Sequence, residues 1–130
     1  MSDERYTLVK LREIDDFAPE HGFGETQEAR FAGEALGCRQ VGISLQRIKP
    51  DRRQAFGHSH AEDEEVYVAL SGGGRIRLDD EVIELAPMDA IRVAPGVKRA
   101  FEAGPEGLEL LAFGTHREGD AQVVPDFWDG

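Results

Sequence analysis

The sequence has 130 residues, including 15 glycines and 6 prolines, and its formal net charge is -11. This length predicts one domain, and the glycine and proline content is typical of a turn-rich β chain rather than a helical bundle. The acidic balance argues against nucleic acid and anionic membrane surfaces as partners, because both select clusters of Lys and Arg.

Cys38 is the only cysteine, so the sequence allows no internal disulfide and nothing in it indicates an oxidising compartment. The first residues are charged and are not followed by the apolar stretch of a signal peptide. No apolar run is long enough to cross a bilayer. These features together predict a cytoplasmic protein without a membrane partner.

The N-terminal third gives weak structural signals. We expect residues 1–4 to be loosely held, residues 6–10 to form an edge strand and residues 14–19 to form a short helical turn. The segment Glu25–Leu36 fits both the alternation of a strand and the spacing of a helix, and a strand over residues 29–32 is preferred. Gly37 then ends the segment.

From residue 41 onward, short alternating runs separated by Gly, Pro and Asp predict a series of strands. They cover Val41–Ile48, Gln54–His60, Val66–Leu70, the hairpin of Arg75–Leu78 with Val82–Leu85, Ala90–Val93 and Leu108–Phe113. Turns are predicted at Ser71–Gly74, at Pro95–Gly96 and at Gly104–Gly107. The closing aromatic pair Phe127 and Trp128 is expected to dock on the barrel or on a partner subunit.

The chemistry-bearing stretch begins with His58 and His60. Residues two apart in a strand point to the same side, so both imidazoles share one face. Glu65 follows after a short spacer. Two imidazoles and one carboxylate form the ligand set that proteins use for divalent Fe, Mn, Ni or Zn.

This stretch resembles the first motif of the cupin family, which is Gly, five residues, His-x-His, three or four residues, Glu, six residues and Gly. His58, His60, Glu65 and Gly72 fit that spacing, whereas Arg52 stands in place of the leading glycine. The spacer also allows Glu64 in place of Glu65, but Glu65 gives the six-residue interval to Gly72. Glu62, Asp63 and Glu64 are then interpreted as solvated loop charges.

Residues 88–101 are similar to the family's second motif, Gly-Asp…Pro-x-Gly-x-x-His-x-Phe, in a degenerate form. Met88 and Ala94 replace its glycine and first proline, and Ala103 stands where asparagine is usual. Arg99 stands at the position of the family's fourth metal ligand, a histidine. Because a guanidinium has no acceptor atom, it cannot ligate a metal.

The resemblance implies an all-β fold, the cupin double-stranded β-helix or jelly-roll barrel, with short N- and C-terminal extensions. The expected division is an N-terminal extension with edge strands over residues 1–39, the barrel over residues 40–115 and a tail over residues 116–130. It also implies a homodimer, because cupins with one barrel commonly pair.

Strand parity predicts which other side chains share the barrel interior with the three ligands. They form a small-molecule pocket with convergent polar groups and apolar walls, made by Gln54, Phe56, Tyr67, Arg99 and Phe101.

Three interpretations of Arg99 remain open. In the first, it binds an anionic substrate beside a divalent transition metal held by His58, His60 and Glu65. In the second, it pairs with Glu65 and the metal-free pocket binds a small ligand without catalysis. In the third, the pocket is closed. The first arrangement permits dioxygenase, isomerase or decarboxylase chemistry, and the sequence does not choose among these.

Overall fold

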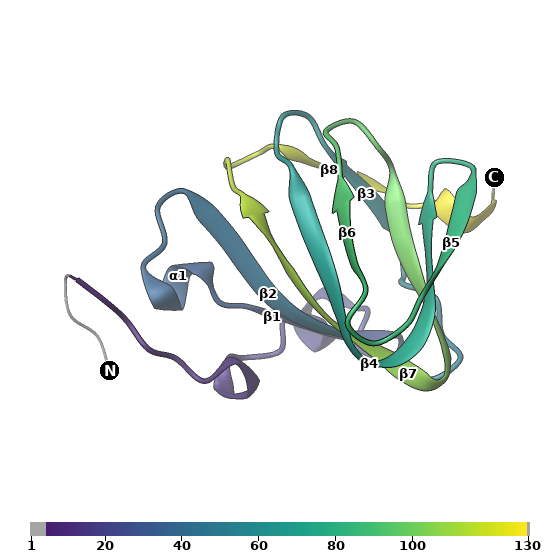
Figure 1. Cartoon of the computed structure of the whole chain (residues 1–130), viewed down its shortest axis with the longest axis horizontal. Helices are drawn as coiled ribbons and strands as arrows, with labels where there is room; N and C mark the ends of the chain where they lie inside the picture. The colour runs from purple at the N-terminus through teal and green to yellow at the C-terminus, as the bar shows by residue number, and fades with distance from the viewer. Residues whose placement is uncertain (1–4, 130) are drawn as a thin grey trace.

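The computed structural model describes residues 5–129, which form one strongly curved antiparallel sheet and a few short helices (Figure 1). The strands are β1 (Gln27–Phe31), β2 (Val41–Ile48), β3 (Gly57–His60), β4 (Glu65–Leu78), β5 (Glu81–Leu85), β6 (Ala90–Val93), β7 (Arg99–Thr115) and β8 (Ala121–Val124). The helices are α1 (Gly33–Leu36) and three 3₁₀ turns, Leu11–Glu13, Pro19–His21 and Phe127–Asp129. The expectation for residues 1–4 lies outside the described residues. None of the described helices is long and apolar enough to cross a membrane.

The sheet runs in the order β1-β2-β7-β3-β8, and β4 joins it by pairing with β7 while also carrying β5 and β6. Figure 1 shows that the strands curl around a common interior. The interior is filled from both long strands by apolar side chains that are almost fully buried, including Tyr67, Ile76, Phe101, Leu108 and Leu110. This architecture agrees with the expected all-β jelly-roll barrel.

Two predicted strands have the bounds that alternation indicated, β2 and β6. β2 pairs with β7 along its whole length, from Val41 opposite Thr115 to Ile48 opposite Leu108. The predicted hairpin is also present, because β4 and β5 pair from Gly74 opposite Leu85 to Leu78 opposite Glu81.

The turns predicted at residues 71–74 and 104–107 are wrong, because β4 and β7 continue through both segments. A Cβ atom on Gly72 would lie 2.0 Å from the Gly107 carbonyl oxygen, and one on Gly74 would lie 2.2 Å from the Glu102 carbonyl oxygen. The two strands therefore cross closely at a bulge, and glycine is needed there for backbone proximity rather than for a turn.

The N-terminal region differs in detail from the expectation. Residues 6–10 form no strand beyond an isolated bridge at Thr7, and 3₁₀ turns flank residues 14–18. The ambiguous segment contains both structures, since β1 ends at Phe31 and α1 begins at Gly33. Gly37 ends the helix with a φ of 75°, a left-handed conformation that favours glycine.

The C-terminal segment packs against the barrel, as expected for its aromatic pair. Phe127 is 6% exposed, and its ring lies directly over Gly57 at the start of β3. Trp128 donates from Nε1 to the carbonyl oxygen of Gln54 across 3.0 Å. These contacts fix the strand that leads into the two histidines.

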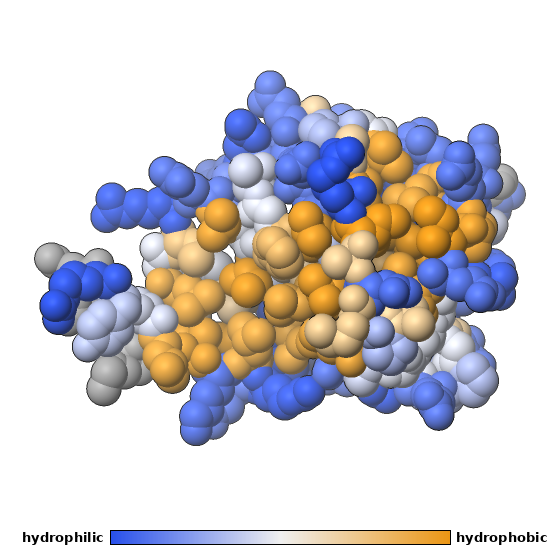
Figure 2. Space-filling model, in the orientation of Figure 1, coloured by the Kyte–Doolittle hydropathy of each residue, from blue (hydrophilic) through white to orange (hydrophobic). Residues whose placement is uncertain are grey.

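Apolar side chains also gather on the outer surface of the sheet, as Figure 2 shows for the face turned to the viewer. Exposed examples come from three strands: Val41 on β2, Leu70 on β4 and Phe113 on β7. We call these three residues the outer apolar face.

Candidate functional site

The two histidines lie on β3, where the alternation of the strand turns both rings to the same side. Their ring centroids are 5.1 Å apart with nearly perpendicular planes. β3 pairs with β8 along its whole length and meets β7 at one position, His58 opposite Arg99. The last strand of the sequence thus holds the histidines in place.

Glu65 opens β4 and brings its carboxylate to the same point. Its Oε1 atom lies 3.5 Å from Nε2 of His58 and 3.6 Å from Nε2 of His60. The ligand atoms of these three residues all lie within 4.8 Å of one another, so the group could hold a metal ion. The three residues are partly buried, with 14–24% of each side chain exposed.

Arg99 lies behind this carboxylate and is fully buried. It donates from Nη2 to Oε1 of Glu65 at 2.8 Å, from Nε to the Tyr67 hydroxyl at 3.0 Å and from Nη1 to the Val97 carbonyl oxygen at 2.9 Å. The Tyr67 hydroxyl in turn donates to Oε1 of Glu65. Of the three interpretations left open for Arg99, the contact with Glu65 is the one that the structure contains, and Arg99 is not among the described residues that line the cavity.

The electrostatics of the cluster keep Glu65 charged and His58 neutral. Burial by itself would raise the pKa of Glu65, but hydrogen bonds with His58, His60, Tyr67 and Arg99 hold it well below the ordinary value. Burial lowers the pKa of His58, and the nearby Glu65 offsets only part of that effect. A neutral imidazole and an ionised carboxylate are the protonation states that bind a metal.

Asp120, just before β8, completes the surroundings of His60 and was missed by the sequence reasoning. Its Oδ2 atom lies 3.5 Å from Nδ1 of His60, which is buried and has no hydrogen-bond partner among the described residues. Asp120 itself accepts the backbone amides of Glu62 and Asp63. No pattern in the tail distinguished it from the other acidic residues.

Asp63 corrects a second expectation, because it was assigned to a solvated loop. It is 1% exposed, it accepts the Arg117 amide at 2.9 Å and it pairs with the Arg117 guanidinium at 2.7 Å. With His60 and Asp120 it forms another group whose ligand atoms lie within 4.8 Å of one another. The loop between β3 and β4 is therefore held in place by contacts with the C-terminal segment.

A cavity of about 300 Å³ opens in front of the three ligand residues. Of the expected lining residues, it includes Gln54 and Phe56 beside His58, His60 and Glu65. Tyr67 and Phe101 lie deeper, at 2% and 1% exposed, and form a ring contact behind the site. Part of the remaining wall comes from an N-terminal segment that was not assigned to the pocket, which contributes Phe17, Phe23, Gln27, Ala29 and Phe31. Residues of β2, β7 and β8 together with His116 form the rest.

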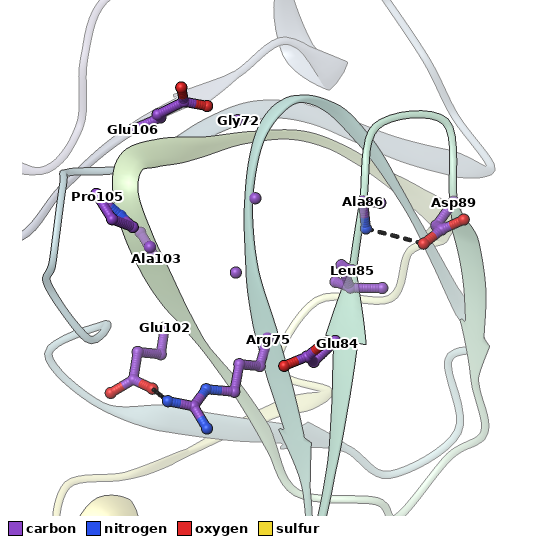
Figure 3. Close-up of a pocket in the computed structure, with 13 residues that line it drawn as sticks. Gly72, Arg75, Glu84, Leu85, Ala86, Asp89, Glu102, Ala103, Pro105 and Glu106 are labelled. Carbon is purple, nitrogen blue, oxygen red and sulfur yellow. Dashed lines mark hydrogen bonds and ion pairs between the residues drawn. The ribbon is translucent and has the colours of Figure 1, made fainter.

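A larger depression of about 660 Å³ lies elsewhere, over the glycine-rich crossing of β4 and β7 (Figure 3). Three of its charged groups are already used within the fold, and the other two, Glu84 and Glu106, are exposed carboxylates. Glu102 pairs with Arg53 and Arg75, and Asp89 accepts the Ala86 amide. The cavity at the histidines is therefore the better candidate site.

Comparisons with known proteins agree with this architecture. The sequence profile of the family described as "Cupin domain" matches residues 44–114, which is more than half of the chain. No curated protein matches the chain.

Solved structures share the fold at low sequence identity. A cupin protein from Bacteroides fragilis has a TM-score of 0.70 and 24% identity, covering 88% of this chain and 86% of that one. The polyketide cyclase RemF from Streptomyces resistomycificus has a TM-score of 0.74 and 18% identity over 93% and 85% of the two chains. Pac13 from Streptomyces, a nucleoside dehydratase, has a TM-score of 0.71 and 15% identity over 92% and 91%, and variants of it were solved with uridine.

Proposed function

The chain belongs to the cupin family, and from that premise we propose that it binds a divalent transition metal through His58, His60 and Glu65. The metal would act on a small organic molecule that binds in the adjoining cavity. The chemistry that Fe, Mn, Ni or Zn supplies in such a site is Lewis-acid polarisation or dioxygen activation, which opens isomerisation, decarboxylation and dioxygenation to this protein.

The observation that carries this proposal is the pair of contacts made by His60. Its Nε2 atom is directed to Glu65, while its buried Nδ1 atom has Asp120 as its nearest carboxylate. A metal-binding histidine commonly donates from its other ring nitrogen to a carboxylate, which fixes the tautomer with a free lone pair at the metal. The 3.5 Å separation needs only a small closure to become a hydrogen bond.

Arg99 supports a second candidate, a metal-free cupin that binds a small ligand without catalysis. Its ion pair with Glu65 already neutralises the carboxylate that a metal would need. A fixed positive charge about 4 Å from a metal opposes binding by roughly 4 kcal/mol per unit charge at an effective dielectric of 20. The two candidates therefore differ in one measurable property, metal affinity.

Metal analysis of the full chain separates them. We expect near-stoichiometric metal after purification without added metal, and restored binding when chelated protein is titrated with Co²⁺ and followed by visible absorption. His58→Gln should abolish this binding, whereas His21→Gln, which alters an exposed histidine outside the cavity, should leave it unchanged. Protein that remains metal-free and ignores Co²⁺ would establish the binding-only candidate instead.

We also propose that two copies of the chain pair through the outer apolar face. The exposed side chains of Val41, Leu70 and Phe113 support this, since an apolar area on a sheet favours association. Light scattering after size exclusion should give the mass of a dimer, and Leu70→Glu should give that of a monomer. An unchanged mass in Leu70→Glu would remove this face from the proposal.

A further inference from the structure

The wall of the cavity carries almost no charge of its own. Among the described residues that line it, none is lysine or arginine, and Glu65 is the one carboxylate. That carboxylate is already paired with the buried guanidinium of Arg99. Without a bound metal, an anionic ligand would therefore enter a space that has no lysine or arginine among its described lining residues, which costs binding free energy.

Aromatic rings instead form a series of contacts along the cavity wall, which ends at Phe56. The Phe31 ring meets Phe17 edge-to-face at 5.3 Å, Phe17 lies 6.1 Å from Phe23, and Phe23 meets Phe56 edge-to-face at 5.3 Å. Phe56 is followed two residues later by His58 on the same side of the chain. All four rings line the cavity, and Phe17 and Phe31 remain 42% and 54% exposed.

His21 stacks on one face of Phe17 at 3.5 Å, and the rest of the exposed surface of Phe17 and Phe31 remains open. An aromatic ligand that covers this surface would gain the stabilisation that burial of an aromatic side chain provides. The cavity of about 300 Å³ is at the small end of the range for ligand pockets. A ligand of one or two fused rings fits this volume.

Two glutamine side chains in the wall present hydrogen-bond donors. Gln54 Oε1 accepts the Phe101 amide at 2.9 Å, and Gln27 Oε1 accepts the Ala55 amide at 3.3 Å. Because a backbone N–H must face an oxygen, both Nε2 groups are left as donors, and neither has a partner among the described residues. The two residues are only 8% and 4% exposed, but neither Nε2 atom is among the fully buried atoms without a partner. Both donors therefore reach open space, where a ligand or water can accept from them.

From these observations we infer that the cavity takes a flat, uncharged aromatic molecule that carries at least one carbonyl or other acceptor oxygen. The phenylalanines contact its ring, and the amides of Gln27 and Gln54 donate to its oxygen. This inference rests on the proposed use of the cavity as a ligand site, but it does not require a bound metal. It differs from the anionic ligand that one of the three interpretations of Arg99 allowed.

Three small molecules of similar size separate the effects of an aromatic ring, of charge and of molecular shape on binding. Chromone is flat, neutral and accepts hydrogen bonds without donating them. Chromone-2-carboxylate adds a negative charge, and 1-decalone keeps a carbonyl on a saturated ring system. In calorimetric titrations of chelated protein, we expect chromone to bind at least about tenfold more tightly than the carboxylate, and about three- to tenfold more tightly than 1-decalone. Equal or tighter binding of either competitor would overturn the inference.

Matched variants locate the binding. Phe56→Leu should weaken chromone binding about three- to tenfold, whereas Phe113→Leu, on the outer apolar face, should not change it. Gln54→Glu keeps an oxygen for the Phe101 amide but removes the donor, and should weaken binding about tenfold. Gln27→Glu is an independent second test if Gln54→Glu melts early. Equal losses in Phe56→Leu and Phe113→Leu would contradict the assignment.

Metal titration of the same preparations tests the proposed metal site independently of the proposed aromatic ligand. Chromone binding without Co²⁺ binding would support this inference and overturn the proposed metal site. Co²⁺ binding without chromone binding would do the reverse.

Discussion

Nη2 of Arg99 donates to Oε1 of Glu65 across 2.8 Å, and the whole arginine side chain is buried behind that carboxylate. Charge-assisted hydrogen bonds of this kind are short and strong. Glu65 therefore has two possible roles: it can neutralise the charge of Arg99, or it can bind a metal together with His58 and His60. Substitutions of Arg99 separate these two roles.

Arg99→His should raise the affinity for Co²⁺ by about tenfold or more. The change removes a positive charge beside the ligand group and places an imidazole at the family's fourth ligand position. Titration of chelated wild-type and variant protein, followed by visible absorption, gives the two affinities directly. Weaker binding in the variant would show that the side chain at position 99 does not point to the metal.

Arg99→Met should lower the free energy of unfolding by about 3 kcal/mol, because the ionised Glu65 loses its buried partner. Urea unfolding at neutral pH measures the difference. Arg92→Met is the matched control, since Arg92 pairs with Glu64 at an exposed position, and its effect should stay within about 0.5 kcal/mol. Similar decreases in the free energy of unfolding in both variants would mean that the burial of Arg99 does not determine the loss of stability.

Asp120→Asn should weaken Co²⁺ binding about ten- to a hundredfold, as expected when the carboxylate beside a ligating histidine is neutralised. The amide oxygen can still accept the backbone amides of Glu62 and Asp63, so the loop should keep its structure. Nitrogen-15 shifts of the His60 ring should show a changed tautomer balance. Asp89→Asn, in the other depression, is the control and should alter neither measurement.

Acid should destabilise the chelated protein in two stages. Because the folded pKa of His58 lies below the ordinary 6.5, the unfolded chain takes up a proton that the folded chain resists, and stability falls as the pH drops below 6.5. The lowered pKa of Glu65 adds a second loss below its ordinary 4.5. Melting temperatures measured from pH 7.5 to pH 3.5 should show both stages. His58→Gln should remove the upper stage, and its persistence there would assign it to another group.

Gly57→Ala should destabilise the protein by about 1–3 kcal/mol, because the new Cβ atom would lie 2.6 Å from Cγ of Phe127. Gly73→Ala is the control, since its nearest neighbour would be 3.6 Å away. Combining Gly57→Ala with Phe127→Leu should cost less than the sum of the two single changes. Additive losses would indicate that the Phe127 ring does not press on β3.

The strands and ligands that could be predicted are those with a strong local pattern. β2 alternates cleanly and has the predicted bounds. The spacing of His58, His60 and Glu65, helped by the family resemblance, brought together three residues that do converge. For the glycines at 72–74 and 104–107, composition could not distinguish a turn from a close crossing, because both exclude a side chain.

The rest of the site depends on contacts that local patterns do not contain. Phe17 and Phe31 reach the cavity from the N-terminal segment, and Asp120 reaches His60 from the C-terminal segment. Each is an ordinary residue in its own neighbourhood. The role of Arg99 was left open because strand parity predicts that its side chain faces the barrel interior but not how deeply it lies there. The structure places the guanidinium behind Glu65 rather than in front of it.

Because β8 holds β3 in place, changes near the C-terminal end of the chain can affect the position of the two histidines. β8 pairs with β3 at four successive positions, whereas β7 meets β3 at a single pair. A purification tag fused behind β8, or proteolytic trimming in that region, would disturb the strand that carries both imidazoles. Preparations that differ only in tag position should therefore be compared before any loss of metal is attributed to a substituted ligand.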